Sequence, residues 1–346
     1  MKTIAIVINL LFLLCIINLS TAQPIVPSYK IVNRFELPED NGWDYPSIEA
    51  STGRLFLSRG SMVQVATVND GKLVGTIPGT KGVHGIALAE DLGKGFASDG
   101  ADSSVTVFDL KTLKVIEKVS VTGENPDAIL YDPYTQRVFT CNGKTSNSTV
   151  IDAKSDKVIG TISLSGRPEF CVTDGMGNIY INIEDKSQID AIDPSKMKVK
   201  NVWSISPGES PSGLAIDAQN HVLFSVCHNK LMVVLDSQTG KVITTLPIGE
   251  RVDGAAFDTE LMRAYSSNGD GTLTIVQEEN KDTFKVMDNL KTQLGARTIT
   301  LDTKTHHLYL PTAEFNPAPA PTADNPRLRP TTKPGSFVIL DVEPVK

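Results

Sequence analysis

The chain has few cysteines, no long basic run and almost no helical pattern. Each of these absences excludes some classes of function. Four cysteines occur in 346 residues, and none has the close Cys or Cys/His spacing of a zinc site. There is no Gly-x-Ser-x-Gly elbow and no glycine-rich phosphate loop leading into a helix. The formal charge is −7, which disfavours a nucleic-acid partner because phosphate binding needs clusters of lysine and arginine.

Long hydrophobic runs are absent after the first 22 residues. Lys2 precedes a nearly unbroken apolar stretch from Ile4 to Ile17, and Ser20-Thr21-Ala22 supplies small residues before Gln23. This order predicts a secretory signal peptide over residues 1–22, cleaved after Ala22. No later stretch approaches the ~20 apolar residues that span a bilayer, so we expect no transmembrane segment after cleavage and a periplasmic or secreted protein.

Three cysteines remain after cleavage: Cys141, Cys171 and Cys227. An oxidising compartment permits a disulfide, but a domain of this size does not need one for stability. We therefore expect free, mostly buried thiols.

The sequence does contain one pattern that recurs seven times, every 40 to 44 residues. Each copy begins with a proline or small residue and a polar residue, and continues as a short apolar run ending at an acid. A period of this length, built from short apolar runs and turn residues, is typical of a β-propeller with one blade per repeat. We predict an all-β fold: a seven-bladed β-propeller of four-stranded antiparallel blades, in one domain over residues 23–346.

The third copy shows how one repeat becomes a blade. Its apolar runs are 128–131, 137–141, 149–152 and 157–162, and polar turns separate them. Four short strands joined by turns predict one antiparallel sheet. The second strand of every copy carries an aromatic residue, whose ring we expect to pack between neighbouring blades. These residues are Phe56, Phe96, Phe139, Tyr180, Phe224, Tyr265 and Tyr309.

The seventh copy stops after its third strand, at residues 336–342. Residues 30–37 have the character of a fourth strand, with a lysine followed by β-branched apolar residues as in the other repeats. Pairing the two ends would close the ring and remove an exposed sheet edge. We therefore predict that the N-terminal strand closes the last blade.

One polar position opens the first strand of every repeat, the strand that lines the channel of a propeller. We expect these seven side chains to converge as a ring at one mouth of the channel. Four carboxylates around a narrow opening repel one another unless a cation, protons or an arginine offset their field. A cation or polar-ligand site is one interpretation, and a hydrated ring of turns is the other. The seven residues are Asp44, His84, Asp127, Glu169, Ser212, Asp253 and Arg297.

The turns after the second strands reach the same face and add candidate ligand-binding residues. One combination is a metal or general acid–base set, in which His84 and His228 join Glu184 or Asp127. The remaining histidines, His221, His306 and His307, fall at the opposite face, where we expect them to be only solvated. The candidates from these turns are Arg59, Glu184, His228 and Glu314.

The largest break in the pattern is a proline-rich insert at residues 311–335, between the second and third strands of the last blade. Its proline density favours extended, polyproline-like backbone. The insert replaces a turn on the ring face, so it is either a cover for the channel mouth or a surface loop. As a cover, it would bring Arg327 and Arg329 to the acidic ring.

The motifs Asn125-Pro126-Asp127-Ala128-Ile129 and 211–217, with Asp-x-x-x-x-Lys-Val between the third and fourth strands, resemble the YVTN β-propeller repeat family. The resemblance spans about residues 29–346. It implies an exported, YncE-like seven-bladed propeller, and it implies little about chemistry because propellers serve many functions.

The function predicted from the sequence is a binding or scaffold protein that recognises a ligand or partner at the channel mouth. The alternative is a metal-dependent hydrolase or lyase that uses the acidic and histidine ring. A divalent cation at the mouth is the candidate cofactor, the partner is a protein or small molecule, and we expect a monomer.

Overall fold

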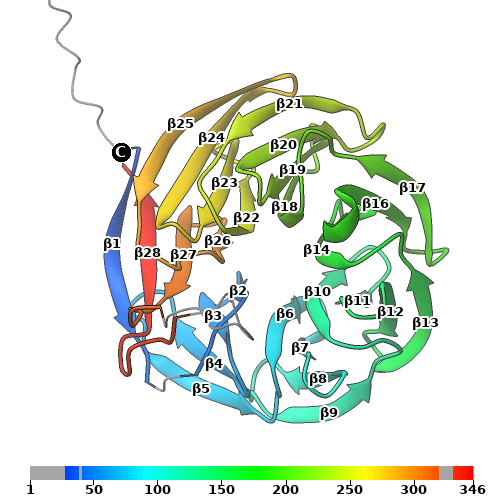
Figure 1. Ribbon diagram of the computed structural model, residues 1–346. Helices are drawn as coiled ribbons and strands as arrows, with labels where there is room; N and C mark the ends of the chain where they lie inside the picture. Colours follow the sequence, from blue (N-terminus) through cyan, green and yellow to red (C-terminus); the bar gives the residue numbers. More distant parts are fainter. Residues whose placement is uncertain (1–27, 39–40, 319–329, 346) are drawn as a thin grey trace, which may run out of the picture.

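The computed structural model describes residues 28–38, 41–318 and 330–345. They form seven four-stranded antiparallel sheets arranged as blades around a central channel (Figure 1). The described residues include two one-turn 3₁₀ helices, η1 (Glu90–Leu92) and η2 (Glu184–Lys186), and no α-helix. The predicted all-β seven-bladed propeller is confirmed. The predicted signal peptide lies outside the described residues.

Each blade contributes one strand to each of four concentric positions, counted outward from the channel. The innermost strands are β2 (Pro46–Glu49), β6 (Val83–Ala89), β10 (Pro126–Asp132), β14 (Pro168–Thr173), β18 (Pro211–Asp217), β22 (Val252–Asp258) and β26 (Thr300–Asp302). The second strands are β3 (Arg54–Arg59), β7 (Lys94–Asp99), β11 (Arg137–Asn142), β15 (Ile179–Ile183), β19 (Val222–Cys227), β23 (Arg263–Asn268) and β27 (His307–Thr312).

The two outer positions complete the blades, which we number 1 to 7 in the order of their innermost strands. The third strands are β4 (Met62–Thr67), β8 (Ser104–Asp109), β12 (Asn147–Asp152), β16 (Gln188–Asp193), β20 (Leu231–Asp236), β24 (Thr272–Asn280) and β28 (Val338–Pro344). The outermost strands are β5 (Leu73–Pro78), β9 (Val115–Ser120), β13 (Lys157–Ser163), β17 (Lys198–Ser204), β21 (Val242–Pro247), β25 (Thr283–Lys291) and β1 (Tyr29–Glu36).

The strand-two aromatics pack between blades, as predicted. All seven rings are at most 2% exposed. Phe56 of blade 1 stacks on Phe108 of blade 2 with ring centroids 5.9 Å apart. Phe224 of blade 5 stacks on Phe257 of blade 6 at 5.1 Å. Buried aromatic pairs of this kind contribute about 0.5–1.5 kcal/mol beyond their area burial, so they hold neighbouring blades together.

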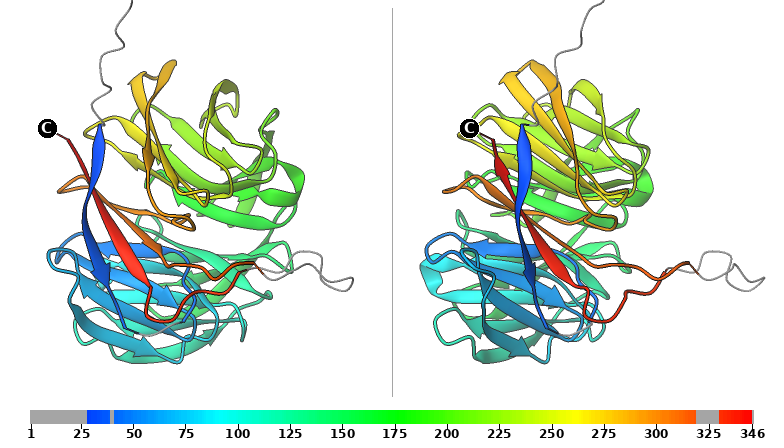
Figure 2. Two further views of the ribbon diagram at one scale, coloured as in Figure 1. Left: turned by 60° about the vertical axis from the view of Figure 1, so that its left-hand side comes forward. Right: turned by 90° about the vertical axis from the view of Figure 1, so that its left-hand side faces the viewer.

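The last blade is closed by the N-terminal strand, which confirms the predicted closure. β1 pairs antiparallel with β28, from Tyr29 opposite Pro344 to Glu36 opposite Val338. Figure 2 shows β1 lying along β28 at the edge of blade 7. The hydroxyl of the fully buried Tyr29 lies 2.7 Å from the hydroxyl of Tyr265 in blade 6. The strands β1 and β28 are therefore fixed to each other and to the adjoining blade.

The turn between the third and fourth strands carries the repeated aspartate of the sequence motif. In blade 3, the amide and hydroxyl of Ser155 donate to Asp152 Oδ1 at 2.8 and 2.7 Å. In blade 2, Thr112 makes the same two contacts with Asp109, both at 2.7 Å. The aspartate satisfies backbone donors that the tight turn leaves without a ladder partner. We call the side of the propeller that holds these turns the turn face.

Two histidines of the turn face differ from the expectation that they are only solvated. His306 Nδ1 lies 2.7 Å from Asp258 Oδ2, and His307 Nδ1 lies 2.6 Å from Asp341 Oδ1. Both aspartates are buried. A buried carboxylate requires a partner, and the sequence does not show that these histidines supply it.

The three cysteines are free and buried, as expected. No helix within the described residues is long and apolar enough to cross a membrane.

Candidate functional site

The seven polar positions converge at one end of the channel. Each stands at or just before the start of an innermost strand, and these strands surround the channel in Figure 1. We call this set the mouth ring, and the side of the propeller that carries it the mouth face. The mouth ring consists of Asp44, His84, Asp127, Glu169, Ser212, Asp253 and Arg297.

Small polar residues on the second strands hold the main chain of the mouth ring. The Ser98 hydroxyl donates to the carbonyl of Asp127 in the next blade. Asn182 Nδ2 donates to the Ser212 carbonyl at 2.8 Å in the same way. Sequence reasoning missed these residues, although they share a signal, since each follows the strand-two aromatic by two positions. They make the mouth ring part of the interblade framework rather than a set of loose turns.

One side of the mouth ring is fully paired. Arg297 Nε lies 3.0 Å from Asp253 Oδ2, and the Ser212 hydroxyl donates to Asp253 Oδ1 at 2.8 Å. The Tyr45 hydroxyl donates to the same oxygen at 3.3 Å. Burial raises the pKa of Asp253, while the charge of Arg297 opposes that rise. This side holds its carboxylate with three donors.

On the other side, His84 stands between two acids from adjacent blades. Its Nδ1 atom lies 2.7 Å from Asp44 Oδ2 and 3.7 Å from Asp127 Oδ1. Burial lowers the pKa of His84, but the hydrogen bond to Asp44 and the charge of Asp127 outweigh it and raise the pKa to about 8. The imidazole rests on Gly100, where an added Cβ would lie 2.7 Å from His84 Nε2. Gly100 therefore leaves the space that the ring occupies.

Two acids of the mouth ring have few positive charges or hydrogen-bond donors nearby to stabilise their ionised forms. Burial, the charge of Asp44 and the charge of Asp253 raise the pKa of Asp127 to about 7, although His84 opposes the rise. Burial and the charges of Asp127 and Asp253 raise the pKa of Glu169 to about 9. No hydrogen bond or ion pair joins the Glu169 carboxyl to another described residue. These two groups would gain most from a bound cation.

Two aromatic side chains meet across the channel next to the mouth ring. Tyr45 of blade 1 and Phe170 of blade 4 pack edge to face, with ring centroids 4.9 Å apart. Blades 1 and 4 lie on opposite sides of the ring of blades (Figure 1), so this contact crosses the channel. Each aromatic directly follows an acid of the mouth ring. We call the mouth ring together with this aromatic pair, its floor, the cup.

Of the four further candidates from the strand-two turns, Glu184 lies close enough to the mouth ring for its charge to help raise the pKa of Glu169. Arg59 is fully buried, and its guanidinium lies 3.5 Å from the centroid of the Phe337 ring. Glu184 forms an ion pair of 2.6 Å with Arg167. Glu314 pairs with Lys333 at 2.8 Å, and His228 is exposed.

The described ends of the proline-rich insert lie beside the mouth ring. Phe315 pairs with Thr332 as an isolated bridge, and Figure 2 shows the two arms leaving blade 7 together. The Phe315 ring centroid lies 6.2 Å from that of Trp43, the residue before Asp44. The insert is thus anchored on the mouth face, as its position between β27 and β28 predicts. Arg327 and Arg329 lie outside the described residues.

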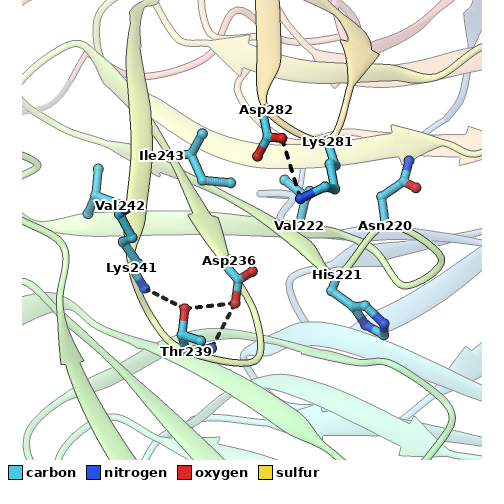
Figure 3. A pocket seen from close by; sticks show the side chains of 10 residues that line it. All are labelled: Asn220, His221, Val222, Asp236, Thr239, Lys241, Val242, Ile243, Lys281 and Asp282. Atoms are coloured by element: carbon cyan, nitrogen blue, oxygen red, sulfur yellow. Dashed lines mark hydrogen bonds and ion pairs between the residues drawn. The ribbon is translucent and has the colours of Figure 1, made fainter.

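A separate cavity of about 230 Å³ lies on the turn face between blades 5 and 6 (Figure 3). Several of its polar groups already have local partners. Thr239 donates its amide and hydroxyl to Asp236, both at 2.8 Å, and Lys281 pairs with Asp282 at 3.3 Å. It offers a ligand fewer uncompensated groups than the mouth ring does.

The comparison with solved structures supports the β-propeller fold. No family model and no curated protein sequence matches the chain. The chain is similar to a solved structure described as Kuenenia stuttgartiensis hydrazine synthase, with a TM-score of 0.70 and 15% sequence identity. The alignment covers 79% of this chain and 94% of that chain. At this identity the likeness shows the β-propeller fold alone.

Proposed function

We propose that this propeller is a binding or scaffold protein that recognises a positively charged group, on a small molecule or a partner protein, at the mouth ring. The observation that carries the proposal is the excess of acid in the cup. Four carboxyl groups face one arginine and one histidine, and the pKa values of Asp127 and Glu169 are raised to about 7 and about 9. A site that is costly when empty favours a ligand that neutralises it.

The shape of the mouth supports binding of an exposed group rather than passage through the channel. The aromatic pair of Tyr45 and Phe170 spans the channel next to the acids. The two described parts of the insert, which pair at Phe315 and Thr332, form a wall beside Trp43. An ammonium or guanidinium group entering the cup would meet carboxylates around an aromatic floor, a combination that suits cations.

Calorimetric titration of the purified chain with a small diamine and with an arginine-containing peptide tests this proposal. We expect both probes to bind, and the double variant D127N/E169Q to bind them about tenfold more weakly, a loss of about 1.4 kcal/mol. E314Q is the matched control, because Glu314 is an exposed acid on the same face. Absence of binding by both probes, or equal binding by the double variant, would contradict the proposal.

The setting of this site is part of the same proposal. Residues 1–22 have the order of a secretory signal peptide, and the repeat motif resembles the YVTN family. We therefore propose an exported, monomeric, YncE-like propeller comprising residues 23–346. Mass spectrometry of the protein secreted by an expressing cell tests export, since a chain beginning at Gln23 is expected and an intact Met1 would contradict it.

A second candidate function is a metal-dependent hydrolase or lyase. The observation that favours it is the approach of ligand atoms from Asp44, His84 and Asp127 to within 4.8 Å of one another. In that function Glu169 would serve as the general acid, because a carboxyl group with a pKa of about 9 is protonated at neutral pH. Chelator-sensitive turnover of ester or lactone substrates that is lost in E169Q would favour this function.

A further inference from the structure

We propose that the mouth ring holds a divalent transition-metal ion between Asp44, His84 and Asp127, three residues from three successive blades. This inference rests on the proposed function, because it names a metal ion as the positive group that occupies the cup. The candidate ligand atoms are one carboxylate oxygen from each aspartate and one ring nitrogen of the histidine, all within 4.8 Å of one another.

The distances need only small adjustments to accommodate an ion. A zinc-like ion with bonds of about 2.0–2.2 Å places tetrahedral ligand atoms roughly 3.4 Å apart. His84 Nδ1 lies 3.7 Å from Asp127 Oδ1, close to that spacing, and 2.7 Å from Asp44 Oδ2. The second pair must open by a fraction of an ångström as the ion replaces the hydrogen bond. The Nδ1 proton leaves to solvent, and the nitrogen lone pair then binds the ion.

The main chain that carries the three ligands is already fixed. The amide of Tyr45 donates to the His84 carbonyl at 3.1 Å, and the Asp44 carbonyl accepts from the Thr298 hydroxyl at 3.0 Å. The Ser98 hydroxyl holds the carbonyl of Asp127. These contacts link blades 7, 1, 2 and 3. A pre-ordered set of ligands loses little entropy when an ion binds.

The environment of Asp127 distinguishes a metal site from a structural ion pair. Its side chain is only 20% exposed, and 3.7 Å from His84 is too long for a hydrogen bond. No described residue donates a hydrogen bond to its carboxylate. An internal ion pair built for stability would close this gap, as His307 does at 2.6 Å from Asp341 on the turn face.

The surrounding charges favour a dication at this position. Arg297 is directed to Asp253 at 3.0 Å and reaches Asp44 Oδ1 only at 4.0 Å. Asp44 Oδ2 therefore stays available on the side of His84. Glu169 is a fourth carboxyl group close to Asp127, and it forms no hydrogen bond or ion pair with another described residue.

The donor set points to a class of ion. One imidazole with two carboxylates suits zinc, manganese or iron(II), whereas magnesium and calcium prefer all-oxygen sites. Gly100 acts as a positioning residue, because a Cβ there would displace the imidazole from its place. We therefore expect Zn²⁺ to bind more tightly than Mg²⁺ and Gly100→Ala to weaken binding.

The test is calorimetric titration of tag-free, chelator-treated protein with Zn²⁺, Mn²⁺ and Mg²⁺, with metal content measured by mass spectrometry. We expect one Zn²⁺ per chain, weaker Mn²⁺ and little Mg²⁺. H84Q and D127N should lose about a hundredfold or more in Zn²⁺ affinity, and G100A about tenfold. H228Q is the matched control, since His228 is an exposed histidine, and it should bind as wild type does.

Visible absorption of bound Co²⁺ in the wild-type protein gives a second readout that does not depend on a variant folding. A coordination spectrum that Zn²⁺ displaces is expected. Lack of stoichiometric Zn²⁺, unchanged affinity in both H84Q and D127N, or equal loss in H228Q would overturn the inference. If the diamine binds and the metals do not, the inference fails while the proposed function stands. If neither binds, both fail.

Discussion

Aspartates occupy a repeated position on each face of this propeller, and the two sets are held in opposite ways. On the turn face, Asp109 and Asp152 accept from the amide and hydroxyl of a residue in their own turn, and the hydrogen bonds to Thr112 and Ser155 lower their pKa values. On the mouth face, burial and neighbouring acids raise the pKa values of Asp127 and Glu169. The first set is stabilised by its surroundings, and the second is strained by them.

This difference shows that the turn-face aspartates, and not the mouth-face acids, stabilise the fold. A turn aspartate meets its partners three residues away, so every repeat can satisfy it locally. A mouth acid meets other mouth acids, because seven blades bring them to one axis. Residues that reduce stability and are nevertheless held in place are characteristic of functional sites.

The largest loss of stability should come from opening the ring of blades, which carries both faces. Deleting residues 23–38 removes β1, its ladder with β28 and the buried Tyr29 and Phe35. Removing even one buried aromatic costs about 3–5 kcal/mol, so we expect a larger loss and the end of cooperative unfolding. Circular dichroism during thermal unfolding checks this, with deletion of 23–27 as the control. A truncated protein that keeps its Tm would refute the closure.

A turn aspartate should give a moderate loss. Asp152→Ala removes the acceptor for both Ser155 donors at 2.8 and 2.7 Å. We expect a destabilisation of about 1 kcal/mol, the usual cost of losing such a local cap. Denaturant unfolding at pH 7 measures it. An unchanged midpoint would show that the repeated aspartate does not stabilise its turn.

An exposed acid on the mouth face should give the smallest effect. Glu314 is paired with Lys333 at 2.8 Å, but its side chain is 61% exposed. Such pairs contribute about 0–1 kcal/mol, so Glu314→Gln should change stability by less than about 0.5 kcal/mol. A larger change, measured by the same denaturant unfolding, would mean that the whole mouth face, and not only the cup, is electrostatically tuned.

The number of blades and their closure could be predicted from the sequence because both depend on local patterns of residues. The repeated acids, the strand-two aromatics and the incomplete last repeat each follow from spacing, and they gave the seven blades and the β1–β28 closure. The convergence of the mouth ring followed as well, since position in a repeat fixes position around the axis.

The pairing inside the mouth ring could not be predicted, because it depends on side chains from different blades. Nothing in the sequence indicates that Tyr45 crosses the channel to Phe170, or that Arg297 favours Asp253 over Asp44. The burial of Arg59 against Phe337 was missed for the same reason. Its position after a strand suggested an exposed turn, but the insert ends where Phe337 can cover it.

Protonation of the mouth acids makes the free energy of unfolding depend on pH. The folded-state pKa values of Asp127 and Glu169 are raised to about 7 and about 9, from ordinary values of 3.8 and 4.5. The folded protein therefore binds more protons than the unfolded chain between about pH 4 and pH 9. In that window the free energy of unfolding falls as pH rises, and this loss should disappear in part when Glu169 is neutral.

The most direct test is the free energy of unfolding of wild type and Glu169→Gln at pH 5 and pH 9, in the presence of chelator. The account predicts that the variant gains stability relative to wild type between these pH values. The expected gain is at least about 1.4 kcal/mol, the equivalent of one pKa unit. A stability difference between variant and wild type that is the same at pH 5 and pH 9 would contradict the claim that the mouth acids are held at the expense of the fold.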